Sequence, residues 1–302
     1  MPGTVSKIPA APLPVRSVPT PRAPTPPRTP SDLWYYRGES PHAIGSIGHE
    51  FIGIVEDIGS QVHGIAEGDL VIAPFVYCDM SCPHCLAGVT SHCVAGGSFG
   101  NGEIDGGQGE AVGVPLAGSS LVPVPGAPSN HSDEMLRSLL ALSDVMCTGH
   151  HAAVCGRVTK GDTIAVVGDG AVGLSAVLAS KRLGAERIIA LSRNPARQQV
   201  AREFGATDIL AERGDDAIAA VLELTDGIGV PFEANFWRAV GWQGGVAPAR
   251  AYIPELLGDV LNGTINPSRV FDYETSLDGI AEAYAAMDER RAIKSLVRVG
   301  SI

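Results

Sequence analysis

Four of the six cysteines lie close together, with the spacing Cys78-x3-Cys82-x2-Cys85-x7-Cys93. Four thiolates can enclose a zinc ion in a tetrahedron, and a shell closed in this way is typical of a structural rather than a catalytic metal site. The cluster therefore predicts a structural zinc in a lobe over residues 78–93. It favours a reducing compartment over a disulfide framework, so we expect a cytoplasmic protein.

A second group of residues has the spacing of a nucleotide-binding turn. Gly168, Gly170 and Gly173 form the pattern G-x-G-x-x-G, with Ala171 and Val172 before the last glycine. Each glycine would be needed because it has no side chain. The first allows a sharp turn, the second lets a pyrophosphate approach the backbone, and the third lets the helix pack tightly. The pattern predicts a dinucleotide site on a helix N-terminus, and the alternative is a glycine-rich turn with no ligand.

The segments around this turn are those that such a site needs. Residues 164–167 are apolar and rich in β-branched side chains, which predicts a strand buried on both faces. Residues 174–183 predict a helix that ends at Gly184, and residues 187–191 predict a second strand. With a third strand expected near residues 208–210, the region predicts a parallel α/β sheet.

The residues after the second strand bear on the choice of cofactor. An Asp or Glu at this point would hold the ribose hydroxyls of NAD. Here the strand is followed by Ser192 and Arg193, with Arg197 one helical turn further on, and no acid stands at the strand tip. A hydroxyl and a guanidinium suit a 2′-phosphate. We therefore expect NADP(H) to be preferred over NAD(H), unless Arg193 and Arg197 are only solvated surface charges.

Composition narrows the class of protein and of partner. The 302 residues carry a formal net charge of −11, which argues against binding to a nucleic-acid backbone. No apolar run approaches the ~20 residues that a membrane-spanning helix needs. No secretory signal is apparent near Met1. We expect a soluble globular protein with enough chain for two domains.

The first 30 residues differ in composition from the rest. Residues 1–30 hold ten of the 22 prolines and no Asp or Glu. Such a run is unsuited to helix or sheet, so we expect a disordered leader. A proline-rich docking segment and a stretch of non-native coding sequence are alternatives. From Ser31 to about Pro125, short strands and frequent turns indicate a small β-barrel or sandwich.

The order of G-H-E-x-x-G at residues 48–53, the cysteine cluster and the glycine fingerprint resembles the zinc-dependent medium-chain dehydrogenase/reductase family, of the alcohol dehydrogenase type. The resemblance implies a GroES-like β-barrel catalytic domain over residues 31–140, a Rossmann domain over residues 141–268 and a return segment over residues 269–302. It also implies hydride transfer between an alcohol or carbonyl compound and a nicotinamide cofactor, and assembly into homo-oligomers.

The resemblance further implies a catalytic zinc held by His49, Glu50 and Asp144. Relatives supply a cysteine two residues before the serine of a C-x-S-D run. Here Thr29 stands in its place, while Ser31 matches the hydroxyl that relays the substrate proton. A neutral hydroxyl is a poor zinc ligand, so retention of this zinc is left open. Asp144 alone is also compatible with a helix N-cap.

Two ligand positions stay open at this point. Relatives have two residues between their first and second structural cysteines, a position that Asp79 occupies here while Cys78 lies one residue early. The fourth structural ligand is therefore Cys78 or Asp79. Cys147 lies one helical turn beyond Asp144 and is a candidate for the missing catalytic thiolate.

The Rossmann region departs from the family. Residues 226–230 run directly into residues 231–237, where relatives have two more strands and a helix. The sheet would lack its fourth and fifth strands and leave apolar faces uncovered. The rest predicts a sixth strand, two helices and a closing strand at 239–242, 249–262, 277–287 and 293–299. Three hypotheses follow: a zinc-dependent, NADP(H)-preferring alcohol dehydrogenase, a catalytically impaired relative that keeps the structural zinc, and a zinc-ribbon interaction module.

Overall fold

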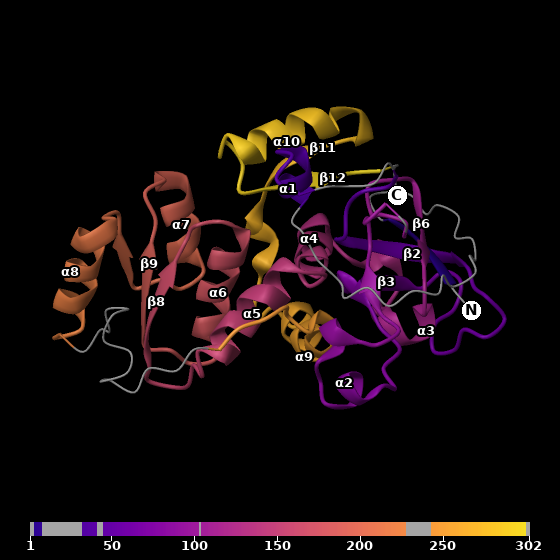
Figure 1. Cartoon of the computed structure of the whole chain (residues 1–302), viewed down its shortest axis with the longest axis horizontal. Helices are drawn as coiled ribbons and strands as arrows, with labels where there is room; N and C mark the ends of the chain where they lie inside the picture. The colour runs from indigo at the N-terminus through magenta and orange to yellow at the C-terminus, as the bar shows by residue number, and fades with distance from the viewer. Residues whose placement is uncertain (1–2, 8–31, 41–44, 103, 228–242, 300–302) are drawn as a thin grey trace. The chain divides into compact units, whose positions relative to one another are not determined.

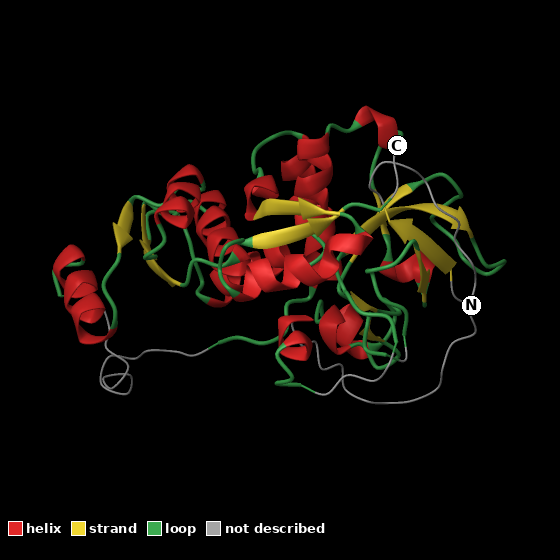
Figure 2. Ribbon diagram, turned by 90° about the horizontal axis from the view of Figure 1, so that it is seen from above, coloured by secondary structure: helices red, strands yellow, loops and turns green. Residues whose placement is uncertain are grey.

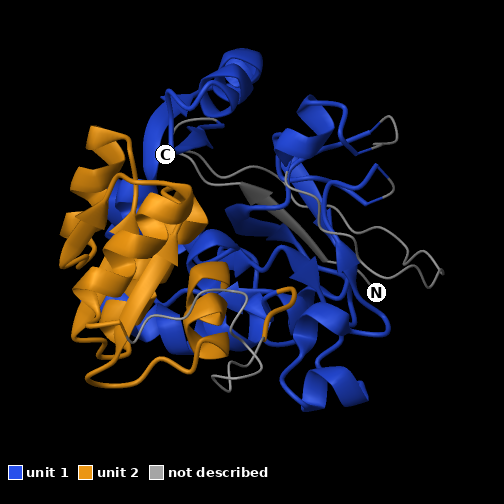
Figure 3. Ribbon diagram, turned by 60° about the vertical axis from the view of Figure 1, so that its left-hand side comes forward, with its two compact units in different colours: residues 1–147, 247–302 blue, residues 148–246 orange. Residues whose placement is uncertain are grey.

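A computed structural model describes residues 3–7, 32–40, 45–102, 104–227 and 243–299. The chain divides into two compact units, residues 1–147 with 247–302 and residues 148–246 (Figures 1 and 3).

The boundaries of the units differ from those that the resemblance implied. Residues 247–268 belong with the first unit, whereas the sequence placed them in the Rossmann domain. The reason is packing: helix α9 (Ala249–Leu261) lies against helix α4 (Asp133–Ala141) and strand β7 (Val122–Pro123) of the first unit.

The first unit is built on a five-stranded antiparallel sheet with the strand order β6-β1-β2-β3-β7. Large apolar side chains from several strands, among them Phe51, Val71 and Val112, are buried in its core. This is the small β-rich domain that the glycine and proline turns predicted. Besides β7, its strands are β1 (Gly3–Lys7), β2 (Phe51–Asp57), β3 (Leu70–Ala73) and β6 (Ala111–Val114).

Strand β1 corrects one expectation for the N-terminal residues. Gly3–Lys7 pairs with both β2 and β6, although residues 1–30 were expected to form no ladder. The reason is local, because this stretch falls between Pro2 and Pro9 and every residue in it has a backbone N–H to donate. Residues 8–30 of the expected leader lie outside the described residues.

Helices and smaller sheets complete the first unit (Figure 2). Strands β11 and β12 form a parallel pair, β4 pairs with β5, and helix α10 packs against both β11 and β12. The predicted helix at 277–287 is thus confirmed as a 3-10 turn followed by α10. These elements are α1 (Asp32–Tyr36), β4 (Val76–Tyr77), α2 (Pro83–Leu86), β5 (Gly97–Ser98), α3 (Ala117–Ser120), β11 (Phe271–Thr275), α10 (Ile280–Asp288) and β12 (Lys294–Val297). Helix α5 (Val145–Cys155) starts in this unit and ends in the second.

The second unit has a parallel three-stranded sheet with the order β10-β9-β8. Each strand is followed by a helix, and the predicted strand–turn–helix–strand unit is confirmed. Its elements are β8 (Thr163–Val167), α6 (Ala171–Arg182), β9 (Arg187–Leu191), α7 (Pro195–Glu203), β10 (Asp208–Leu210) and α8 (Gly214–Leu224).

Strand β8 is not buried on both faces, as its composition had predicted. It is an edge strand of the described sheet, Ala165 is exposed, and Val167 has 82% of its surface accessible. The cause is the one foreseen from the shortened sequence, since no described strand pairs with its outer edge. The junction at residues 229–236 and the strand expected at 239–242 lie outside the described residues. Among the described helices, none is both long and apolar enough to cross a membrane.

Candidate functional site

The cysteine lobe brings four ligand groups together. The side chains of Asp79, Cys82, Cys85 and Cys93 each offer one ligand atom, and these atoms all lie within 4.8 Å of one another. Cys82 and Cys85 are placed by the short helix α2, with Cys82 at its N-cap and proline in its first turn. Three thiolates and a carboxylate form a set that suits zinc.

The structure favours Asp79 over Cys78 for the fourth place in this group. One carboxylate oxygen of Asp79 accepts hydrogen bonds from the backbone N–H groups of Ser81, at 2.9 Å, and Cys82, at 3.0 Å. These bonds fix the carboxylate, and they lower its pKa against the opposing effect of burial. The Cys78 thiol is buried but is not a member of the group, and burial raises its pKa to about 11.

A second group lies at the entrance to strand β2. His49 and Glu50 immediately precede β2, and Asp144 immediately precedes helix α5. The backbone N–H of Phe75 donates to the carbonyl of Ser143, which ties the start of α5 to the first sheet. One ligand atom from each of His49, Glu50 and Asp144 lies within 4.8 Å of the others, so the structure brings together the three residues named from the sequence.

The imidazole of His49 is held from both sides. Its Nδ1 lies 3.0 Å from Asp32 Oδ1, and its Nε2 lies 3.3 Å from Asp144 Oδ2 and 3.8 Å from Glu50 Oε1. A hydrogen bond from Nδ1–H to Asp32 leaves Nε2 directed at the other two carboxylates, which is the orientation that a metal-ligating histidine needs. Burial lowers the pKa of His49, but Asp32 and Asp144 outweigh it and raise the pKa well above its usual value.

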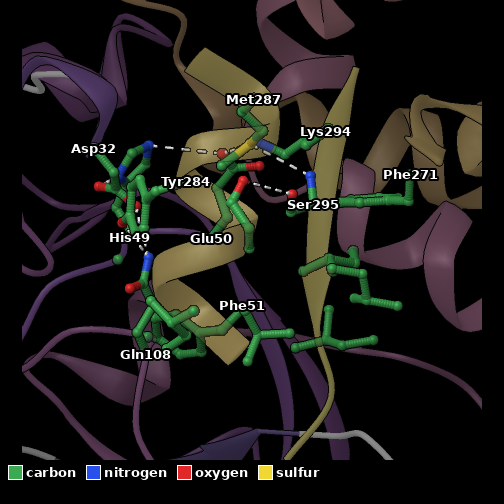
Figure 4. Close-up of a pocket in the computed structure, with 18 residues that line it drawn as sticks. Asp32, His49, Glu50, Phe51, Gln108, Phe271, Tyr284, Met287, Lys294 and Ser295 are labelled. Carbon is green, nitrogen blue, oxygen red and sulfur yellow. Dashed lines mark hydrogen bonds and ion pairs between the residues drawn. The ribbon is translucent and has the colours of Figure 1, made fainter. Parts of the chain in front are cut away.

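Lys294 supplies a cation to the same place. Its Nζ lies 2.5 Å from Glu50 Oε1, and both side chains are largely buried. Burial raises the pKa of Glu50, and the ammonium opposes that shift. Figure 4 shows Lys294 on strand β12 beside Glu50, with His49 and Asp32 on the other side of the pocket.

A hydrogen-bond chain extends from Asp32 to helix α10. Gln108 donates from its amide nitrogen to Asp32 Oδ2, at 3.0 Å, and the same nitrogen lies 2.6 Å from the Tyr284 hydroxyl. Tyr284 stacks on Tyr36 with ring centroids 5.4 Å apart. Both oxygens of Asp32 are therefore engaged, and the residue acts as a support for His49 rather than as a ligand.

The donor set fits a zinc ion. Glu50 Oε2 is a buried carboxylate oxygen with no hydrogen-bond partner among the described residues, which a cation would satisfy. An imidazole nitrogen and two carboxylates leave an open coordination position. Cys147 does not join the group, because its buried thiol donates to the carbonyl of Leu142. Thr29 and Ser31 lie outside the described residues.

The glycine turn of the second unit has the predicted geometry. Gly168 has φ +118°, in the region that favours glycine, and it turns the chain out of β8. A Cβ on Gly170 would meet no described atom within 4 Å, so its backbone faces open space. A Cβ on Gly173 would fall 2.2 Å from the carbonyl oxygen of Gly168. Helix α6 starts at Ala171, followed by Val172, so its first N–H groups adjoin that space.

The tip of strand β9 differs from the sequence expectation in one respect. No acid follows β9 in the sequence, but the fold brings Asp169 from the glycine turn to within 2.9 Å of Ser192 Oγ. Arg197 is buried rather than solvated, with its guanidinium 3.6 Å from Asp169 Oδ1. Arg193 is exposed.

Sequence reasoning missed several residues of both sites. Asp32 had a signal, since it ends the run of residues 29–32 in which Ser31 was singled out. Lys294, Gln108 and Tyr284 had none, because only the tertiary fold brings them to the pocket that His49 lines.

Comparison with known proteins agrees with both units. Residues 28–126 match the family described as an alcohol dehydrogenase GroES-like domain, and residues 171–235 match zinc-binding dehydrogenases. The chain is similar to an alcohol dehydrogenase from Cupriavidus necator, with 36% identity over 66% of this chain and 58% of the relative. An NADP-dependent isopropanol dehydrogenase from Clostridium beijerinckii is 35% identical over 61% of this chain and 51% of its own length. The chain thus spans little more than half of these two relatives.

Two further matches cover a larger share of the matched protein. A medium chain reductase/dehydrogenase, ucsI, from Acremonium is 34% identical over 66% of this chain and 69% of its length. The solved structure of alcohol dehydrogenase TADH from Thermus sp. ATN1 superposes with a TM-score of 0.80 and 26% identity, covering 96% of this chain and 99% of the other. With these family matches, and with two candidate metal-binding groups and a glycine turn in the expected order, the chain belongs to the zinc-type medium-chain dehydrogenase/reductase family.

Proposed function

We propose that this chain is a zinc-dependent oxidoreductase that transfers hydride between a small alcohol or carbonyl compound and NADP(H). The observation that carries the proposal is the convergence of His49, Glu50 and Asp144 within 4.8 Å, beside a buried oxygen that lacks a hydrogen-bond partner among the described residues. Zinc held there would act as a Lewis acid that lowers the pKa of an alcohol. A nicotinamide would supply the hydride acceptor.

The chain's own residues orient this site. Asp32 fixes the ring of His49 through Nδ1, and Gln108 in turn fixes Asp32. Lys294 balances the charge of Glu50 within a buried setting. We assign Ser31, from the family resemblance, to carry the substrate proton away.

The preference for NADP(H) rests on two observations. Ser192 and Arg193 follow strand β9, where a 2′-phosphate would lie in a fold of this type. Three relatives, one from Clostridium beijerinckii, are named as NADP-dependent isopropanol dehydrogenases. We also propose a structural zinc on Asp79 and the three cysteines after it, and a reducing, cytoplasmic setting.

A catalytically impaired relative is the second candidate, and a specific observation favours it. Strand β8 pairs with no second strand among the described residues, and Val167 is 82% accessible, at the edge where a longer parallel sheet would continue. Such a protein would still bind metal at the two candidate groups and a cofactor at the glycine turn, but it would not catalyse useful turnover.

One assay separates these candidates. Purified protein with added zinc is given secondary alcohols and NADP⁺, and the absorbance of the reduced cofactor is followed. Turnover that Asp144→Ala abolishes supports the dehydrogenase and dismisses the impaired relative. Tight NADP⁺ binding with no turnover on any alcohol or, in reverse, any ketone dismisses the dehydrogenase.

A further inference from the structure

The glycine turn carries an acid that meets the tip of strand β9. Strands β8 and β9 are parallel, with Val167 opposite Leu191, so the residues that follow each strand lie at the same edge of the sheet. Asp169 is the residue between the first two glycines of the fingerprint. Its Oδ2 accepts a hydrogen bond from Ser192 Oγ at 2.9 Å. In a dinucleotide fold this edge adjoins the adenosine ribose.

A carboxylate at this place would favour NAD(H), because it accepts from ribose hydroxyls and repels a 2′-phosphate. The charge of Asp169 is compensated, however. Arg197 Nη1 lies 3.6 Å from Asp169 Oδ1 and donates to the Asp169 backbone carbonyl at 3.3 Å. The side chains of Arg197 and Asp169 are only 7% and 9% exposed. An ion pair removed from water in this way presents little net charge to a ligand.

The pair is built into the local fold. Asn194 caps helix α7 by accepting from the N–H groups of Ala196 and Arg197, which sets the position of Arg197 in the first turn. Gln198 donates to the Ser192 carbonyl at 2.7 Å. Arg193, which lies between Ser192 and Asn194 in the sequence, is exposed. The sum over Asp169, Arg197 and Arg193 is therefore one positive charge, and it is carried by the exposed guanidinium.

We propose that the buried Asp169–Arg197 pair sets the cofactor preference of the glycine turn. Arg197 does not bind the 2′-phosphate itself; it cancels a carboxylate that would otherwise exclude the phosphate, so that Arg193 attracts it. This inference rests on the proposed dinucleotide site and names the residues that decide between its two cofactors.

The test measures the dissociation constants of NADP⁺ and NAD⁺ by calorimetry, without turnover. Arg197→Gln leaves the carboxylate uncompensated and lowers the affinity ratio of NADP⁺ to NAD⁺ at least about tenfold. Asp169→Asn leaves the guanidinium uncompensated and raises the same ratio. The double variant Asp169→Asn/Arg197→Gln returns the ratio to near that of the wild type. Arg202→Gln, an exposed arginine later in helix α7, serves as the matched control and leaves the ratio unchanged.

Thermal unfolding of each variant shows whether it is folded. If Arg197→Gln does not fold, the rise expected for Asp169→Asn still tests the proposal. A ratio that stays the same or falls in Asp169→Asn overturns it, as does a loss in Arg197→Gln that the double variant fails to restore. If the wild-type protein binds neither dinucleotide, the proposed cofactor site and this inference are both overturned. If the wild type prefers NADP⁺ and neither single substitution changes the affinity ratio, only the inference is overturned.

Discussion

The ammonium of Lys294 lies 2.5 Å from Oε1 of Glu50, across a separation of 244 residues in the sequence. The contact joins strand β12, close to the C-terminal end of the described chain, to the residue that follows His49. Their side chains are 18% and 15% exposed, so the pair is largely removed from solvent. Since Glu50 Oε2 has no hydrogen-bond partner among the described residues, one carboxylate faces both the ammonium and the candidate metal position.

Lys294→Met is expected to destabilise the metal-free protein by about 3 kcal/mol, because it leaves a buried carboxylate without its counter-ion. Added zinc should recover part of the loss, since a cation bound by the folded state compensates the same charge. Urea unfolding with a chelator and with excess zinc measures both effects.

Lys294→Arg is the matched control, because it keeps the positive charge. It should lose much less stability than Lys294→Met in the chelated protein. Equal losses for the two variants would show that packing rather than charge explains the contact.

The lobe makes a prediction about metal content. Asp79→Ala should lower bound zinc by about one ion per chain, because it removes one of four ligands from a closed site. Cys78→Ser should leave the zinc content unchanged, since the Cys78 thiol lies outside the group. Elemental analysis after exhaustive dialysis measures the difference. Loss of zinc in Cys78→Ser with retention in Asp79→Ala would reverse the assignment.

Local sequence patterns predicted the second unit closely, because each of its signals acts over a few residues. The strands at 187–191 and 208–210 have the expected bounds, and the glycines at 168 and 173 have the predicted turn and close contact. The histidine and two carboxylates that the fold brings together were also named from the sequence, but through family order rather than spacing. Asp144 is far from His49 in the sequence, and only the fold brings them together.

Features that depend on tertiary neighbours were not predictable from local patterns alone. The apolar run at Ile164–Val167 by itself indicated burial on both faces, and only the shortened sequence after residue 226 indicated that apolar faces would be left uncovered. The acid near Ser192 was missed because it comes from the preceding turn rather than from the strand tip. Arg197 was expected to contact phosphate or water, but it is buried against Asp169, which no periodicity connects to it.

The glycine turn allows a matched pair of substitutions. Gly173→Ala should destabilise the protein by about 1–3 kcal/mol, because its Cβ would overlap the carbonyl oxygen of Gly168. Gly170→Ala should change stability by less than about 1 kcal/mol, because its φ of −80° is ordinary and no described atom lies nearby. Gly170→Ala should nevertheless weaken NADP⁺ binding at least about tenfold, because the methyl group occupies the approach of the pyrophosphate. Undiminished binding would place the phosphates elsewhere.

Glu274 gives a prediction about pH. Its carboxylate accepts from Arg298 and Arg137, both at 2.6 Å, and these contacts lower its pKa below the ordinary value of 4.5. A lowered folded-state pKa contributes stability above the unfolded-state pKa, and that stability is lost as the pH falls through the folded-state pKa. Because the side chain is 38% exposed, Glu274→Gln should cost only about 0.5–1 kcal/mol at pH 7. The difference from wild type should shrink as the pH falls from 7 to 3, because the carboxylate becomes protonated below its lowered pKa, and urea unfolding across this range measures it.

The matched control for Glu274→Gln is Glu67→Gln, which alters an exposed carboxylate of the same unit. This variant should unfold like the wild type at both pH values, because an isolated surface charge contributes little to stability. If Glu274→Gln instead lost the same free energy at pH 3 as at pH 7, the effect would come from packing of the side chain. The two arginines would then not account for the stability attributed to this carboxylate, since a protonated glutamate no longer pairs with them.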